Sequence, residues 1–344
     1  MRKHWIDYLR VIAIIAVITI HSTTHFYSKF NEIGQLDWWL ANLLNSASRF
    51  AVPLFVMISG ALLLERNLPI GEFYKKRAIR LLPAIIVWNL FYAGVNVGIE
   101  IFNGKDIKTL TYHIGALFAD GGAAVHLWYL SMFLCLMLFT PFINIFINGD
   151  KPKSADLRIL LGLMFLFFFF NGVSNVVWEI WDVEIIWFKV FPWYIAYFTG
   201  GYYIDKYSNH ITIKSNFILF FLTILILSGA MLNYYFMNSY KIIEDNLIMI
   251  NTGPMVFLLT VVIFLLAKRN SLVLKENKLI SIIAEASFGM YLIHPVFLHI
   301  LKYKLPMYYS NALVNLPLTI FITTIASFFS IVSLRKLSIM RKIC

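Results

Sequence analysis

Charged residues are too scarce in this chain for a water-soluble protein. Only 14% of the 344 residues are Asp, Glu, Lys or Arg, whereas 60% are hydrophobic and 31 are phenylalanine. A globule of this length could not hide so much apolar surface in its interior. The composition therefore excludes a soluble protein and predicts an integral membrane protein.

Cysteine is also nearly absent. The two cysteines, Cys135 and Cys344, cannot form a disulfide framework or a CxxC metal site. The sequence also contains no HExxH, GxSxG, Walker or Rossmann pattern. We therefore expect no bound metal and none of the enzyme classes that those motifs mark.

Long polar loops are the third absence. The longest loops, around 102–122 and 236–247, have room only for short helices or lids. We therefore treat 1–344 as one membrane-embedded domain with no separate soluble domain.

Apolar runs of the length needed to cross a bilayer recur from end to end, and we predict an all-α polytopic bundle of about ten transmembrane helices. We place these spans at about 5–26, 37–64, 79–101, 123–147, 157–177, 185–204, 215–236, 247–267, 279–301 and 310–334. Most of the 29 Lys and Arg residues then fall on the side of the N-terminus, which predicts that both termini are cytoplasmic. This distribution accounts for the net charge of +11 without a nucleic-acid partner.

The first span contains an arginine and a histidine on one helix face. His21 follows Arg10 by eleven positions, which puts their side chains on the same face of a helix, about 16 Å apart along it. Ionisable groups inside a membrane are costly and usually mark a polar path or a reactive site. The alternatives are a hydrogen-bonded structural histidine and, for Arg10, an ion pair with Asp7 at the helix end.

Three other spans carry polar or aromatic groups that could shape a pocket. Helix packing and interfacial anchoring are the alternatives for each of them. The residues are Arg49, Ser59 and Gly60 in 37–64, Trp128 and Tyr129 in 123–147, and Glu285, Tyr291 and His294 in 279–301.

Arg77 and Arg80 lie three residues apart in FYKKRAIRLLP, next to Lys75 and Lys76. Guanidinium groups bind phosphate bidentately, so this pair is a candidate phosphate site at the cytoplasmic mouth. The alternative is that these residues are ordinary cytoplasmic charges that meet lipid headgroups.

Taken together, these segments resemble the membrane-bound acyltransferase-3 family. Arg10 and His21 match the family's Arg-x10-His motif, and Arg77 and Arg80 match its Arg-x-x-Arg motif. RFAVPLFVMISG, HLWYL and SFGMYLIHP also resemble family blocks, in order. NLLNSASRFAVPLFVMISG and TGPMVF look closest to the branch that contains the enterobacterial-common-antigen O-acetyltransferase.

The resemblance implies transfer of an acetyl group from cytoplasmic acetyl-CoA to a hydroxyl of a cell-envelope glycan or its lipid-linked precursor, in a bacterial plasma membrane. Arg10, Arg77 and Arg80 would bind the CoA phosphates, and His21 would be the general base. The expected partners are an acyl-CoA donor, the glycan acceptor and membrane lipids, with a homo-oligomer left open.

One feature departs from the lipopolysaccharide-modifying members of the family, many of which have acidic residues just after the LW-x-L-S block. This chain reads MFLCLMLF there and has none. Asp7 is too far from His21 to be its acidic partner, and Glu285 is the remaining candidate. An envelope-glycan transporter or flippase, a non-catalytic subunit, and an acyltransferase that uses succinyl or another donor remain alternative functions.

Overall fold

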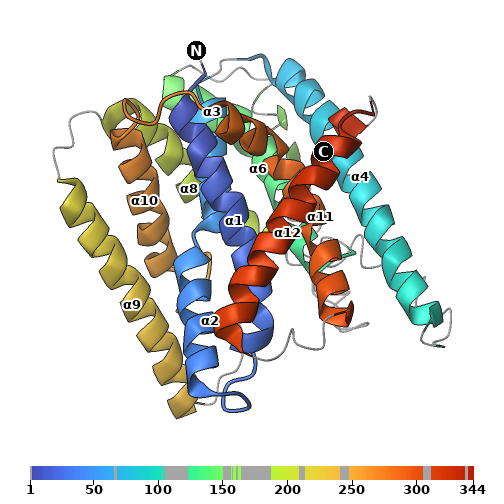
Figure 1. Ribbon diagram of the computed structural model, residues 1–344. Helices are drawn as coiled ribbons and strands as arrows, with labels where there is room; N and C mark the ends of the chain where they lie inside the picture. Colours follow the sequence, from blue (N-terminus) through green and yellow to red (C-terminus); the bar gives the residue numbers. More distant parts are fainter. Residues whose placement is uncertain are drawn as a thin grey trace. The chain divides into compact units, whose positions relative to one another are not determined.

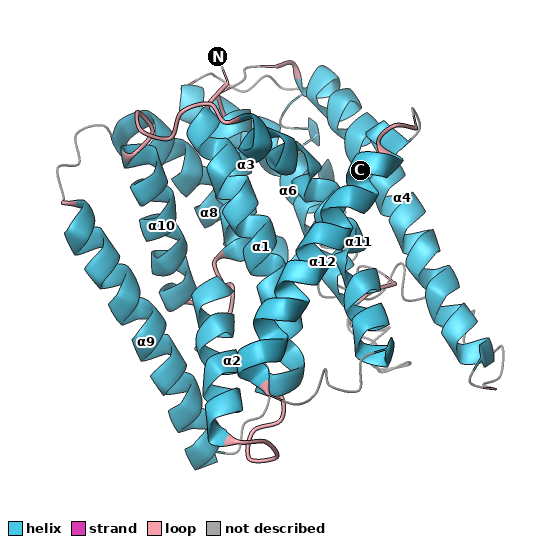
Figure 2. Cartoon of the chain, in the orientation of Figure 1, coloured by secondary structure: helices cyan, strands magenta, loops and turns pink. Residues whose placement is uncertain are grey.

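The computed structural model describes residues 2–65, 68–102, 104, 123–149, 156, 158–159, 162–163, 187–208, 214–240, 248–304, 311–337 and 340–344. All regular structure within these ranges is helical (Figure 2).

The α-helices are labelled in Figure 1. Their bounds are α1 His4–Tyr27, α2 Gln35–Ser48, α3 Ala51–Leu63, α4 Ile70–Phe102, α6 Trp128–Asn148, α8 Trp187–Tyr207, α9 Ser215–Tyr240, α10 Pro254–Arg269, α11 Lys278–Lys304 and α12 Ala312–Leu334.

Seven segments among the described residues are long and apolar enough to cross a membrane, so the chain is a multi-pass membrane protein. They are His4–Tyr27, Gln35–Leu63, Ile70–Phe102, Val125–Asn148, Ser215–Ser239, Lys278–Lys302 and Ala312–Leu334. Each overlaps a predicted span.

The other three predicted spans are not confirmed. The span predicted at 157–177 lies almost entirely outside the described residues. The span predicted at 185–204 is the helix α8, whose sequence is rich in tyrosine, tryptophan and glycine and is not among the seven. The span predicted at 247–267 begins later, as the 16-residue α10, because a residue before proline disfavours helix and Pro254 follows Gly253.

The span predicted at 37–64 is interrupted in its middle. Helix α2 ends at Ser48 and α3 begins at Ala51, with a turn at Arg49 and Phe50. Pro53 explains the position of this break, because a proline has no N–H for the carbonyl four residues earlier, which here is that of Arg49.

The chain forms two compact units. Unit 1 comprises Met1–Ala61, Tyr197–Leu337 and Cys344, and unit 2 comprises Leu62–Ala196 and Ser338–Ile343. Within unit 1, α1 packs against α2, α10, α11 and α12 (Figure 1). Within unit 2, α4 packs against α6.

Both ends of α1 are held by specific contacts within unit 1. At the Tyr27 end, Trp38 donates its indole N–H to the carbonyl of Tyr27 at 3.0 Å, inside an apolar cluster that includes Ala312. At the other end, the buried carboxylate of Asp205 in α8 pairs with Lys3 at 2.5 Å and with Lys268 of α10 at 2.8 Å. These contacts fix α1 between its neighbours.

Candidate functional site

The candidate site lies along the face of α1 that packs on α11. At the N-terminal end of this face, Arg10 Nη1 lies 3.8 Å from Asp7 Oδ1, which is the ion pair expected from their spacing. Ser281 of α11 donates to the same Asp7 carboxylate at 3.4 Å.

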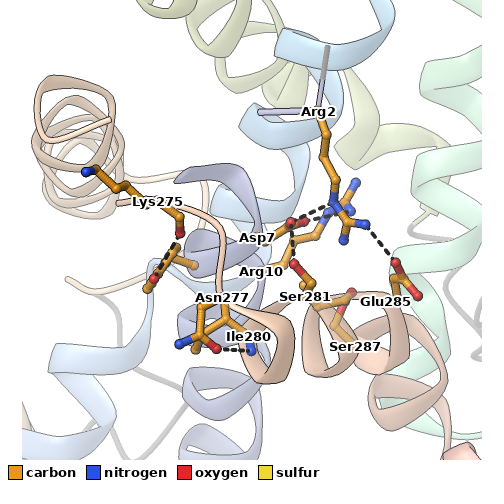
Figure 3. A network of polar contacts seen from close by, with 11 residues as sticks. Arg2, Asp7, Arg10, Lys275, Asn277, Ile280, Ser281, Glu285 and Ser287 are labelled. Carbon is orange, nitrogen blue, oxygen red and sulfur yellow. Dashed lines mark hydrogen bonds and ion pairs between the residues drawn. The ribbon is translucent and has the colours of Figure 1, made fainter. Parts of the chain in front are cut away.

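Arg2 joins α1 to α11 at this end. Its guanidinium donates to Asp7 Oδ2 at 2.8 Å and to Glu285 Oε1 at 2.9 Å (Figure 3). The bond to Asp7 is the main cause that raises the pKa of Arg2, so this guanidinium stays charged. Asp7 is buried, whereas about half of the Glu285 side chain is exposed.

The contact with Arg2 places Glu285 at the Arg10 end of the face. Glu285 precedes His294 by nine residues on α11, which corresponds to about 14 Å along a straight helix. The structure therefore gives Glu285 an arginine partner and does not bring it to His21, for which the sequence analysis offered it as a candidate partner.

His21 lies next to His294 of α11. Their ring centroids lie 5.1 Å apart and the ring planes are tilted by 46°. His294 is completely buried, while His21 is partly exposed. Nδ1 of His294 lies 2.7 Å from the backbone carbonyl of Tyr291, and the Tyr291 side chain is itself buried. Three of the predicted site residues therefore meet at one place.

The opposite face of α1 carries a different polar network. Asn45 of α2 donates to Thr23 Oγ1 at 2.9 Å, and Arg49 Nε donates to Asn45 Oδ1 at 2.7 Å. Thr23 lies two residues after His21, and two residues turn a helix by about 200°. Arg49 is thus linked through Asn45 to the contact between α1 and α2.

Asn233 of α9 bonds to two other residues of α2 and is a residue that the sequence analysis missed. It donates to Asn42 Oδ1 at 3.5 Å and to Ser46 Oγ at 3.3 Å. Asn233 is the asparagine in the interior of the otherwise apolar α9, away from Asn216 and Asn238 near its ends, and that position is the signal that could have pointed to it.

Ser59 and Gly60 lie on α3, where Ser59 bonds within its own helix and Gly60 lies against α8. The Ser59 hydroxyl donates to the carbonyl of Phe55 in its own helix at 2.8 Å. A Cβ atom on Gly60 would overlap the backbone carbonyl of Phe198 in α8, so the missing side chain lets the two helices touch. The surroundings of Gly60 are therefore those expected if the residue allows close helix packing, which was the alternative to a role in a pocket.

Four further predicted residues belong to unit 2. Arg77 is partly buried, with its guanidinium 5.2 Å from the ring centre of Phe73, whereas Arg80 is exposed. Both arginines lie in the first turns of α4. Trp128 and Tyr129 begin α6, and the Trp128 ring lies 6.0 Å from that of Tyr194.

The described residues contain no group of three His, Cys, Asp or Glu side chains that could hold a metal ion. The groups gathered on the α11-facing side of α1 are instead a guanidinium cluster with its carboxylates and, further along, two imidazoles. At one end of this face two guanidinium groups are paired with two carboxylates, and at the other end the imidazoles offer proton transfer.

Comparison with known proteins places the chain in a family. Residues 3–335 match the family model Acyl_transf_3, described as an acyltransferase domain. No curated protein and no solved structure matches the chain. Because the match covers nearly the whole sequence, the chain belongs to the acyltransferase-3 family.

Proposed function

We propose that the protein is an O-acetyltransferase that moves an acetyl group from cytoplasmic acetyl-CoA to a hydroxyl of a cell-envelope glycan or its lipid-linked precursor. One observation carries this proposal within the acyltransferase family. His21 is a partly exposed imidazole deep in α1, on the helix face that carries Arg10 one pantetheine length away.

In the proposed reaction, neutral His21 removes the proton from the acceptor hydroxyl. The oxygen attacks the thioester carbonyl, a carbon–oxygen bond forms, and the carbon–sulfur bond breaks. His21 then returns the proton to the sulfur, and CoA leaves as a thiol. Base catalysis contributes about 10²–10⁴-fold, so positioning and oxyanion stabilisation must supply the rest.

Arg10, Arg77 and Arg80 are proposed to bind the CoA phosphates. The side chain of Arg10 is 31% exposed and can be approached from outside the helix bundle. The rise of about 1.5 Å per residue puts His21 about 16 Å further along α1, which suits an extended pantetheine arm. Phosphate binding and acyl transfer would then occur at the two ends of that arm.

The acceptor is proposed from the resemblance to the enterobacterial-common-antigen branch, which also implies a bacterial plasma membrane. Assays with succinyl-CoA and longer acyl-CoA donors would show whether the same site transfers an acyl group other than acetyl. Ser59, the Gly60 backbone, Trp128 and Tyr129 stay proposals for the walls of the pocket.

The test is donor binding by calorimetry, together with transfer from radiolabelled acetyl-CoA to lipid-linked glycans extracted from bacterial membranes. The protein is purified in nanodiscs as the full chain, as wild type and as His21→Ala. His299→Ala, which removes an exposed histidine of α11, is the control. We expect His21→Ala to bind acetyl-CoA and to lose transfer, and His299→Ala to keep both.

Two results would overturn the proposal. If well-folded wild type binds no acetyl-CoA, a glycan transporter becomes the better explanation of the bundle. If His21→Ala still transfers acetyl groups at the wild-type rate, His21 is not the base.

A further inference from the structure

A proline in α11 frees the carbonyl to which His294 is bound. In a regular helix the carbonyl of Tyr291 would accept the backbone N–H of residue 295. That residue is Pro295, which has no N–H, so this carbonyl cannot be satisfied by its own helix ladder. Nδ1 of His294 lies 2.7 Å from the Tyr291 oxygen and takes the place of the missing donor.

This bond determines which nitrogen of His294 carries the proton. A carbonyl oxygen can only accept a hydrogen bond, so Nδ1 must be the donor. In the neutral ring, Nε2 then carries a lone pair and can only accept. Nε2 of His294 is buried within the bundle.

A ring N–H of His21 can donate a hydrogen bond to Nε2 of His294. The ring centroids lie 5.1 Å apart and the planes are tilted by 46°, a separation across which two imidazoles can share a hydrogen bond. His294 is completely buried and is therefore held in place by its surroundings, whereas His21 is partly exposed. The His294 ring can thus orient the His21 ring.

We propose that His294 is the positioning residue of the base, an inference that rests on the proposed acyl transfer. With the substrates bound, Nε2 of His294 would accept the N–H of His21, which would hold the lone pair on the other nitrogen of His21 toward the acceptor hydroxyl. When His21 takes the hydroxyl proton, the N–H that faces His294 remains bonded and stabilises the imidazolium. His294 itself neither gains nor loses a proton in the cycle.

An imidazole in this role supplies the hydrogen-bond acceptor that a carboxylate would otherwise provide to His21. Asp7 and Glu285, the carboxylates of α1 and α11, are both bound to Arg2 at the far end of this helix face. A neutral acceptor orients the base without placing a further charge in the membrane interior, where charge is costly.

Two substitutions of His294 separate positioning from structure. In His294→Asn, the amide N–H can still donate to the Tyr291 carbonyl, but nothing reaches the Nε2 position. In His294→Gln, the longer side chain carries its amide to the Nε2 position, where its oxygen can accept the N–H of His21. We expect both variants to bind acetyl-CoA normally, the Asn variant to lose about 10²-fold or more in kcat, and the Gln variant to recover at least tenfold of that loss.

A third variant changes the hydrogen bond without touching either histidine. Pro295→Ala supplies a backbone N–H that competes with Nδ1 of His294 for the Tyr291 carbonyl. The variant should be as stable as wild type or more so, because a proline inside a helix removes a backbone hydrogen bond and is destabilising. We expect kcat nonetheless to fall about tenfold with little change in KM for acetyl-CoA.

The outcomes distinguish this inference from the proposed function. If His21→Ala abolishes transfer while His294→Asn and Pro295→Ala keep wild-type kcat, the acyltransferase stands and the positioning role is wrong. Equal losses in the Asn and Gln variants, with wild-type kcat in Pro295→Ala, would reduce His294 to a structural residue. If His294→Asn does not fold, Pro295→Ala alone decides.

Discussion

Gly201 of α8 lies so close to the backbone carbonyl of Met57 in α3 that a Cβ atom on the glycine would overlap it. Because the obstacle is backbone, it cannot rotate away as a side chain would. We expect Gly201→Ala to destabilise the protein by about 1–3 kcal/mol through forced separation of the helices. The measurement is the thermal unfolding midpoint in nanodiscs, followed by the fluorescence of the nine tryptophans.

The neighbouring glycine provides the matched control. A Cβ on Gly200 would meet nothing within 4 Å, although the residue lies in the same helix. Gly200→Ala should leave the midpoint unchanged or raise it, because alanine is favoured over glycine inside a helix by about 1 kcal/mol. Similar losses in both variants would mean that this close approach does not hold α3 and α8 together.

Substitution of Thr23 tests whether the side of α1 that faces α2 contributes to stability but not to catalysis. Thr23→Val removes the acceptor of the Asn45 amide in a buried environment, which should cost about 1–3 kcal/mol of stability. Catalysis per folded molecule should be unchanged, since His21 lies about 200° around the helix. Chemical unfolding combined with acetyl transfer at saturating donor measures both quantities.

Thr24→Val serves as the control for this position. The Thr24 hydroxyl is exposed and bonds only the Ile20 carbonyl of its own helix. Its replacement should change stability by no more than about 0.5 kcal/mol. Loss of transfer in fully folded Thr23→Val would place the α1–α2 network in the reaction.

Local rules predicted much of this architecture. Hydropathy located α1 to within a residue at each end, and helical periodicity put Arg10 and His21 on one face. The interruption at Arg49 also follows from sequence, because Pro53 stands four residues later, although composition alone joined 37–64 into one span. Such features depend on neighbours in the chain, so they can be read from it.

The pairing of helices could not be read in this way. His21 and His294 are separated by almost the whole chain, and hydropathy does not say which helix covers which face of α1. Glu285 shows the same limit, since only the packed structure reveals that Arg2 is its partner. The sequence does contain one indication of this site, which is Pro295. A proline in a helix leaves the carbonyl four residues earlier, here that of Tyr291, without its usual backbone donor, and the adjacent His294 can take that donor's place.

The arginine pair of α4 gives the last prediction. Replacing Arg77 and Arg80 together by alanine should weaken acetyl-CoA binding by about 10²-fold or more, because two charge-assisted hydrogen bonds contribute about 1.5–3 kcal/mol each. Calorimetry with acetyl-CoA and with dephospho-CoA, which lacks the 3′-phosphate, measures the effect. If the arginines hold that phosphate, its removal should cost the double variant less affinity than it costs wild type.

The same helix supplies a control that removes equal charge. Lys75 and Lys76 are exposed, and Lys76 pairs with Glu72 at 2.6 Å, so the Lys75→Ala, Lys76→Ala variant loses two cations beside the arginine pair. A general positive field would make the two double variants equally weak binders and equally sensitive to salt. Bidentate binding by guanidinium groups would weaken only the arginine variant, because an ammonium group lacks that planar fork. Equal weakening would therefore assign Arg77 and Arg80 to the membrane surface, and a selective loss would assign them to the donor.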